Sequence, residues 1–269
     1  MNQQPIGYMD SGVGGLTVVK ESLRQLPNEQ VIFIGDQARL PYGPRPADQV
    51  RKFAWQMADF LLSKHVKMIV IACNTATAAA LDDLQSKLDI PVIGVISPGS
   101  RAAIKATKNE EIGVIATEGT IKSDAYKRSI EHKDPHAHVL SLAAPKFVPL
   151  VESNAYKSPI AKKVVAETLR PYRHTDIDTL VMGCTHYPLL RPIIQNVVGP
   201  KVKLIDSGAE TVNTVSTLLD YFHLGNSDFS HAPQHEFYTT GSAEMFDTIA
   251  RDWLQLRHLQ AHHLDLEGA

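Results

Sequence analysis

Two cysteines, Cys73 and Cys184, are the residues whose type and placement most directly offer chemistry, and they are the only cysteines in the 269-residue chain. Each ends a short apolar run and precedes small hydrogen-bonding residues. The two stretches read M-I-V-I-A-C-N-T from Met68 and T-L-V-M-G-C-T-H from Thr179. A thiolate can remove a proton and a thiol can donate one. Two opposed cysteines would therefore exchange a proton at a carbon atom from opposite faces and invert that carbon.

Neighbouring groups must stabilise a thiolate if it is to act as a base. Half ionisation of an ordinary thiol at pH 7 requires about 2 kcal/mol of stabilisation, which helix ends and nearby charges can supply. Asp10 and His186 are the candidate helpers, because each is expected at the same sheet edge as a cysteine. Asp10 fits a turn or a helix cap equally well, and His186 fits a histidine that is hydrogen-bonded at the end of a strand.

The cysteines also admit other interpretations. Buried cysteine often behaves as a small hydrophobic residue. A zinc site needs three or four ligands, and only His186 stands at close metal-type spacing, two residues beyond Cys184. A redox pair is disfavoured because 111 positions separate the two thiols. We expect no metal, and we expect His258, His262 and His263 to lie in a frayed polar C-terminal end.

Strands that alternate with helices must position these residues. The expected strands cover residues 6–10, 30–35, 68–73, 90–96, 139–142 and 235–240, with two more that begin at 112 and 179. The expected helices cover residues 16–26, 47–64, 77–88, 158–171, 207–222 and 242–256. This alternation predicts an α/β protein with mainly parallel sheets. Ligands bind such sheets at the carboxyl ends of the strands, where both cysteines stand.

The pattern of strands restarts at Ile112. The stretch from Ile112 parallels the stretch from Ile6 at an offset of 106 residues, and the two cysteines are offset by 111. I-D-S-G at Ile205 parallels I-S-P-G at Ile96 at an offset of 109. These nearly constant offsets predict two pseudo-symmetric, three-layer α/β domains with the active site in the cleft between them. The first domain is expected to comprise residues 1–97 and 208–269, and the second residues 98–207.

Composition indicates an ordinary globular protein, because 43% of the residues are hydrophobic and 21% are charged. A net charge of -2 argues against a nucleic-acid partner or an anionic membrane surface. The N-terminus lacks the basic start and apolar core of a signal peptide, and no stretch approaches the roughly 18 apolar residues of a membrane span. We therefore expect a cytoplasmic protein.

Six short motifs follow one another along nearly the whole chain. They are D-S-G-V-G-G at Asp10, P-Y-G at Pro41, A-C-N-T-A at Ala72, A-T-E-G-T at Ala116, G-C-T-H-Y-P at Gly183 and D-S-G at Asp206. In this order they resemble the cofactor-independent glutamate racemases, and together they are highly specific. Racemases that act on aspartate or hydantoins also use paired cysteines and are the nearest alternative. The P-Y-G and G-C-T-H-Y-P strings favour glutamate.

The resemblance implies that Cys73 and Cys184 are the catalytic bases, assisted by Asp10, His186 and Glu152. In family terms Cys184 deprotonates L-glutamate and Cys73 deprotonates D-glutamate, and the D-glutamate product enters bacterial peptidoglycan. The implied substrate contacts are Asp10, Ser11, Pro41, Tyr42, Gly43, Asn74, Thr75, Thr117, Thr120, Thr185 and His186. Neither pyridoxal phosphate nor a metal is expected. The expected partner is the small-molecule substrate glutamate, and a homodimer is left open.

Two functions from other classes also remain open. A non-catalytic, two-lobed amino-acid-binding protein would use the same cleft without the chemistry, although such proteins are often exported and no export signal is seen. A thiol-metal hydrolase would use the cysteines as ligands. Exchange between glutamate isomers distinguishes a racemase from the binding protein, and stoichiometric metal identifies the hydrolase.

Overall fold

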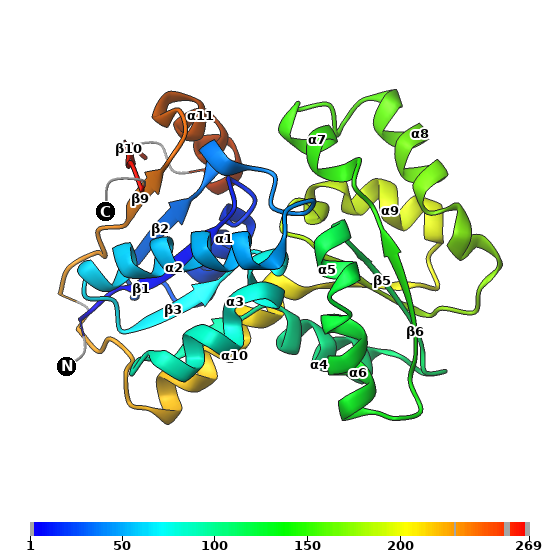
Figure 1. The fold of residues 1–269 in the computed structure, drawn as a ribbon, viewed down its shortest axis with the longest axis horizontal. Coiled ribbons are helices and arrows are strands. Elements are labelled where there is room, and N and C mark those ends of the chain that lie inside the picture. The colour runs from blue at the N-terminus through cyan, green and yellow to red at the C-terminus, as the bar shows by residue number, and fades with distance from the viewer. Residues whose placement is uncertain (1–2, 229, 256–258, 267–269) are drawn as a thin grey trace. The chain divides into compact units, whose positions relative to one another are not determined.

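The computed structural model describes residues 3–228, 230–255 and 259–266. The chain divides into two compact units. The first unit comprises Met1–Val95 with Gly208–Ala269, and the second unit comprises Ile96–Ser207. Each unit is built on one parallel β-sheet with helices packed against it (Figure 1). The predicted α/β class with mainly parallel sheets is confirmed.

The first unit contains a six-stranded sheet with the strand order β10-β9-β2-β1-β3-β4, and its neighbouring strands are parallel. Its strands are β1 (Ile6–Asp10), β2 (Val31–Gly35), β3 (Met68–Ile71), β4 (Val92–Gly94), β9 (Glu236–Thr239) and β10 (Ala261–His263). β1 lies between β2 and β3, and all five of its residues are buried. The strand that carries Asp10 is therefore fixed by neighbours on both sides.

Helices cover both faces of this sheet. They are α1 (Leu16–Gln25), α2 (Ala47–Ser63), α3 (Asn74–Lys87), α10 (Ser207–Tyr221), α11 (Ala243–Leu254) and the short 3-10 turn η1 (Gln37–Arg39). Ile6 and Tyr8 share a core with α1, α10 and α11, whereas Met9 and Ile71 share a core with α2 and α3. Successive residues of a strand point to opposite faces, so the continuous apolar strands supply both cores and give three layers.

The second unit contains a four-stranded parallel sheet with the order β6-β5-β7-β8. Its strands are β5 (Glu111–Ala116), β6 (His138–Ala143), β7 (Thr179–Gly183) and β8 (Lys203–Asp206). Its helices are α4 (Ile96–Ala106), α5 (Glu118–Lys122), α6 (Ala125–Lys133), α7 (Phe147–Glu152), α8 (Pro159–Thr168) and α9 (Arg191–Val198), with the 3-10 turns η2 (Arg170–His174) and η3 (Tyr187–Leu190). Helix α4 packs against α6, β7 and β8, and α8 packs against α9.

The order of four strands is the same in both units. β2-β1-β3-β4 of the first sheet corresponds to β6-β5-β7-β8 of the second. Ile6 is paired with Met68 in the first sheet, and Ile112 is paired with Thr179 in the second. The offsets of 106 and 111 residues therefore relate equivalent positions, and Cys73 and Cys184 occupy equivalent places beyond β3 and β7.

The third landmark of the repeat is misaligned. Val70 is paired with Ile93, and its equivalent Val181 is paired with Ile205. Ile205 therefore corresponds to Ile93, whereas Ile96 already begins helix α4. The two strings I-S-P-G and I-D-S-G have similar letters but differ in structure, because Ile96 begins a helix whereas Ile205 lies in β8 and the next helix begins at Ser207.

The C-terminal end also differs from the expectation. Residues 261–263 form β10, which pairs with β9, so the prediction of a frayed end is wrong there. Leu259, Ala261 and Leu266 are buried and hold this segment, whereas His262 and His263 face solvent. The expectation rested on the polar histidines, whereas the apolar residues around them are buried. His258 lies outside the described residues.

Asp178 fastens the loop that follows α4 to the start of β7. Its carboxylate accepts hydrogen bonds from Thr107 Oγ1 at 2.6 Å, the Lys108 N–H at 2.6 Å and the Asn109 N–H at 3.2 Å. Burial raises the pKa of Asp178, but these donors outweigh burial and hold the pKa below its ordinary value of 3.8. The carboxylate therefore stabilises the fold above pH 3.8, and this contribution is lost as the pH falls through the lowered pKa.

Replacing Asp178 by alanine should lower the free energy of unfolding at pH 7 by about 2 kcal/mol, because several donors lose a charged acceptor. Urea unfolding measures this change. Asp176→Ala is the control, since it removes an exposed carboxylate two residues earlier. Equal destabilisation by the two variants would contradict the assignment of the loop contacts to Asp178.

Candidate active site

Cys73 lies at the carboxyl edge of the first sheet and caps helix α3. Its sulfur accepts a hydrogen bond from the Ala76 N–H at 3.4 Å, and its thiol donates to Ser11 Oγ at 3.6 Å. The residue is 5% exposed. The N-terminus of a helix carries partial positive charge, so α3 stabilises negative charge on this sulfur. The expected helix 77–88 therefore begins earlier, at Asn74, because the cysteine itself is the cap.

Asp10 is the last residue of β1 and is fully buried. Its Oδ2 accepts hydrogen bonds from the Gly12 N–H at 3.3 Å and the Gly15 N–H at 2.9 Å. A Cβ atom on Gly15 would lie 2.6 Å from Asp10 Cβ, so the turn requires glycine there. The amides of the turn thus hold the Asp10 carboxylate, next to Ser11, which contacts Cys73. Asp10 organises this turn whatever further role it has.

The side chain of Tyr42 faces the protein core. It is 1% exposed, its ring packs 5.6 Å from that of Phe53, and its hydroxyl donates to Asp36 Oδ2. Burial, reinforced by the Asp36 carboxylate, raises the pKa of Tyr42 far above its usual range, so the hydroxyl stays a donor. The Leu40-Pro41 peptide bond is cis. Because the Tyr42 side chain is held in the core, the backbone of the P-Y-G loop, including buried Gly43, is the part suited to ligand contact.

Small polar side chains follow the strand ends that carry or adjoin the two cysteines. Asn74 and Thr75 form the first turn of α3, and both are at least 94% buried. In the second unit Thr117 caps α5, and its Oγ1 accepts from the Thr120 N–H at 3.4 Å. Thr185 directly follows Cys184 and is 7% exposed. These side chains are neutral and lie at or just beyond the carboxyl ends of strands.

Cys184 directly follows β7 and belongs to a relay with His186 and Glu152. The Cys184 sulfur lies 3.9 Å from His186 Nδ1, and His186 Nε2 lies 2.5 Å from Glu152 Oε1. His186 is 2% exposed, whereas the Glu152 side chain at the end of α7 is 21% exposed. The structure thus brings together three residues that the sequence pattern named separately.

The protonation of His186 follows from this relay. Burial lowers the pKa of His186, but the hydrogen bonds and charges of Cys184 and Glu152 outweigh burial and raise the pKa from 6.5 to about 10. The ring is then an imidazolium at neutral pH. It can donate from Nε2 to the Glu152 carboxylate and from Nδ1 to a thiolate on Cys184.

Tyr187 supports the relay, a role that was not predicted from the sequence. The residue is fully buried, and its hydroxyl donates to the Ala144 carbonyl oxygen at 3.0 Å. Its ring packs edge-on against Phe147 in α7, with ring centroids 5.1 Å apart. Tyr187 therefore ties η3, beside His186, to the helix that carries Glu152. Its place within G-C-T-H-Y-P was the available signal.

Comparison with known proteins identifies the family. The family model for Asp/Glu/Hydantoin racemase matches residues 6–215. The chain belongs to this racemase family. A glutamate racemase of Carnobacterium sp. (strain St2) is 66% identical over 267 residues, which are 99% of this chain and 100% of that protein. The resemblance drawn from the six motifs is confirmed.

Solved structures of glutamate racemases share the racemase fold of this chain. An isoform from Bacillus anthracis superimposes with a TM-score of 0.96 at 44% identity, covering 99% of both chains. The enzyme of Francisella tularensis, solved in complex with D-glutamate, gives a TM-score of 0.92 at 37% identity over 100% of both chains.

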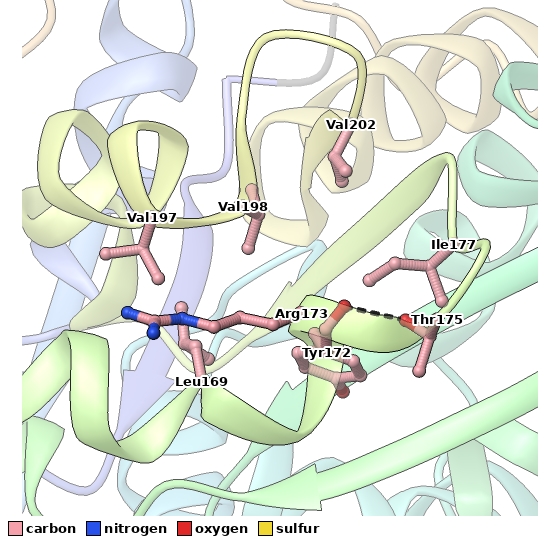
Figure 2. Close-up of a pocket in the computed structure, with 8 residues that line it drawn as sticks. All are labelled: Leu169, Tyr172, Arg173, Thr175, Ile177, Val197, Val198 and Val202. Atoms are coloured by element: carbon pink, nitrogen blue, oxygen red, sulfur yellow. Dashed lines mark hydrogen bonds between the residues drawn. The ribbon is translucent and has the colours of Figure 1, made fainter.

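A pocket of about 190 Å³ in the second unit lies away from these residues (Figure 2). It is lined by Leu169, Tyr172, Arg173, Thr175, Ile177, Val197, Val198 and Val202. The Thr175 hydroxyl donates to the Tyr172 carbonyl oxygen at 2.9 Å, drawn as the dashed line in Figure 2. The lining residues precede β7 and β8, so the pocket lies at the amino edge of the sheet, opposite the edge that carries Cys184. It is not part of the cysteine site.

Within the described ranges, no group of three or more His, Cys, Asp and Glu side chains is arranged to hold a metal ion. The same residues contain no helix with the length and apolar character of a membrane span. Cys73 and Cys184 form no disulfide, and both are buried.

His186 should remain protonated until the pH approaches about 10, because Cys184 and Glu152 favour the imidazolium. Nitrogen-15 NMR of the histidine rings measures this titration, and Glu152→Gln should lower the apparent pKa. Because the folded-state value is raised, the interaction stabilises the fold fully below pH 6.5 and is lost as the pH rises through about 10. A His186 titration centred near 6.5 in the unmodified chain would contradict the relay.

Proposed function

We propose that this chain is a glutamate racemase that interconverts L-glutamate and D-glutamate. The observation that carries the proposal is the 66% identity, over 99% of the chain, to a protein named glutamate racemase. The fold agrees, since glutamate racemase structures superimpose on the whole chain. The two equivalent strand-end cysteines supply the chemistry that such a reaction needs.

The proposed reaction uses the two sulfurs as opposed bases. In the L-to-D direction a Cys184 thiolate takes the α-proton, and the electron pair of the broken C–H bond moves onto the α-carbon and its carboxylate. The Cys73 thiol then delivers its proton to the opposite face and becomes a thiolate. The reverse direction uses Cys73 as the base and Cys184 as the acid. One proton is removed and one is delivered, so no oxidant or reductant is needed.

Neighbouring groups would restore the protonation of the sulfurs. On the Cys184 side, the His186 imidazolium lies 3.9 Å from the sulfur and is anchored by Glu152, so it is suited to neutralise the Cys184 thiolate and to return a proton to that sulfur after it has acted as the acid in the D-to-L direction. After the L-to-D direction the Cys184 proton must instead leave to solvent or to a neutral His186. On the Cys73 side, the helix N-terminus and Ser11 contact the sulfur, and Asp10 precedes Ser11. We assign Asp10 the corresponding helper role.

The substrate would be held by neutral donors. We assign this role to the backbone N–H groups of Tyr42 and Gly43 and to the side chains of Ser11, Asn74, Thr75, Thr117, Thr120 and Thr185, beside the helpers Asp10 and His186. Pro41 has no N–H, so we assign its contact to the carbonyl oxygen, which can accept from the substrate ammonium. The burial of Ser11, Asn74, Thr75, Thr120 and Thr185 supports the assignment, because fixed dipoles act strongly where water is excluded. Aspartate is the alternative substrate, and a chiral assay of both amino acids decides between them.

We infer that the enzyme acts in the cytoplasm and supplies D-glutamate for peptidoglycan. A reducing compartment would keep the two sulfurs as thiols, which the two-base scheme requires. The homodimer stays a prediction, and sedimentation of the purified chain tests it.

L-glutamate incubated with the protein in heavy water, without added cofactor, should acquire deuterium at the α-carbon and appear as D-glutamate. Proton NMR follows the loss of the α-hydrogen, and chiral chromatography follows the inversion. Glutamate that binds but neither exchanges nor inverts would identify an amino-acid-binding protein instead.

Cys73→Ala and Cys184→Ala should each lower racemisation by at least about 100-fold, the usual contribution of a positioned acid or base. The variants should differ in exchange without inversion. Cys73→Ala retains the base for L-glutamate and should slowly incorporate deuterium into that isomer only, whereas Cys184→Ala should do so with D-glutamate only. Unchanged racemisation in either variant would exclude the two-base scheme.

A further inference from the structure

Asp36, directly after β2, is a charged residue that the proposed reaction does not use. It is completely buried, and its carboxylate receives three side-chain donors. Arg39 Nε donates to Oδ2 at 2.7 Å, the Tyr42 hydroxyl donates to the same oxygen, and Thr240 Oγ1 donates to Oδ1 at 2.8 Å. Burying a carboxylate is costly unless it is paired and hydrogen-bonded. Here both conditions are met at the sheet edge that carries Asp10 and Cys73.

The contacts of Asp36 join three segments that are distant in sequence. Its backbone N–H donates to the carbonyl oxygen of Asp10 at 3.0 Å, which links it to the end of β1. Tyr42 links it to the P-Y-G loop, and Thr240 links it to the turn that follows β9. Thr240 Oγ1 also accepts from the Ala38 N–H at 3.0 Å, and the Thr240 N–H donates to the Gly35 carbonyl oxygen at 3.1 Å. The turn therefore holds the chain on both sides of Asp36.

Arg39 balances the charge of Asp36 within the protein. Its guanidinium lies 4.0 Å above the Phe53 ring, and its Nη1 donates to Gln56 Oε1 at 2.5 Å. The Arg39 side chain is only 12% exposed. The pair therefore fixes the loop without adding net charge beside an anionic substrate.

We propose that Asp36 is a positioning residue for substrate binding, because it holds the Tyr42 side chain and thereby sets the backbone of residues 41–43. This inference rests on the proposed function, in which that backbone contacts glutamate. Asp36 acts through Tyr42 and does not touch the substrate. Its loss should loosen the loop and weaken binding of both isomers while the cysteines stay in place.

Asp36→Asn tests the proposal, and Glu29→Gln is the matched control. Glu29 forms a second buried ion pair of the first unit, 2.6 Å from Lys67 Nζ, and it lies before β2, at the opposite edge of the same sheet. Each variant removes one carboxylate charge from a buried pair. Both should lower the melting temperature, so stability alone does not distinguish positioning from a structural role.

The kinetic constants distinguish the two roles. Asp36→Asn should raise KM for L-glutamate and D-glutamate about tenfold and change kcat less than about threefold. This pattern is expected because the loop would bind the substrate equally in the ground state and in the transition state, so that its loss weakens binding without slowing the chemical step. Glu29→Gln should leave both constants unchanged. Tyr42→Phe removes a single hydroxyl and should raise KM about threefold by the same reasoning, which keeps the test available if Asp36→Asn does not fold. Wild-type KM in the folded Asp36 and Tyr42 variants would overturn the proposal.

Amide hydrogen exchange separates this proposal from the proposed function. The peptide that covers residues 40–46 should exchange at least about tenfold faster in Asp36→Asn than in Glu29→Gln, because only the former releases the loop. Wild-type protein without racemase activity would refute the proposed function, and the exchange measurement would still decide whether Asp36 holds the loop. Equal exchange in the two variants would overturn the positioning role.

Discussion

Parallel pairing of β1 with β3, and of β5 with β7, is the constraint on which the candidate active site depends. Met9 is paired with Ile71, so Asp10 and Cys73 leave the first sheet at the same edge. Ala116 is paired with Gly183, and Cys184 follows at once. A side chain on Gly183 would meet the Tyr126 ring at 2.9 Å and the Ile115 carbonyl oxygen at 3.0 Å, so the strand end is closely packed. Register and packing together decide where each sulfur lies, because a slip of one residue would turn every side chain to the other face.

The two cysteines are equivalent in the fold but not in their surroundings. Strand register equates Thr75 with His186 and Asp10 with Ala116, so neither helper has a counterpart in the other unit. Cys73 caps a helix of 14 residues, whose N-terminus can stabilise a thiolate. Beyond Cys184 the chain forms only the short turn η3 before α9, and the buried imidazolium stands beside the sulfur instead. The structure therefore places a helix N-terminus beside one sulfur and a buried imidazolium beside the other.

The sequence alone was sufficient for eight of the ten described strands and for the family, because apolar runs and turn motifs are local signals. It did not predict β8 and β10, which are short strands at the edges of their sheets. Register was harder, and the misplaced equivalence of Ile96 with Ile205 shows why: a short string does not reveal whether it begins a helix or lies in a strand. Asp36 was missed for a related reason. An aspartate after an apolar run reads as an ordinary turn residue, and its burial depends on Thr240, more than 200 positions away.

The hydrogen-bond network of Asp36 also offers a reason why neutral donors, and not an arginine, would contact the proposed substrate. Two arginines, Arg39 and Arg45, lie in the P-Y-G loop region. The Arg39 guanidinium is engaged by Asp36, Gln56 and the Phe53 ring. Arg45 Nε donates to the carbonyl oxygens of Arg39 and Pro41. An arginine that instead clamped a substrate carboxylate would bind the ground state and the transition state alike, which lowers KM without raising kcat. A racemase must also release two isomers that present the same carboxylates. Under the proposed function, fixed dipoles would bind both isomers without such a clamp, and the Asp36–Arg39 pair would hold the loop that presents some of them while keeping its own charge internally balanced.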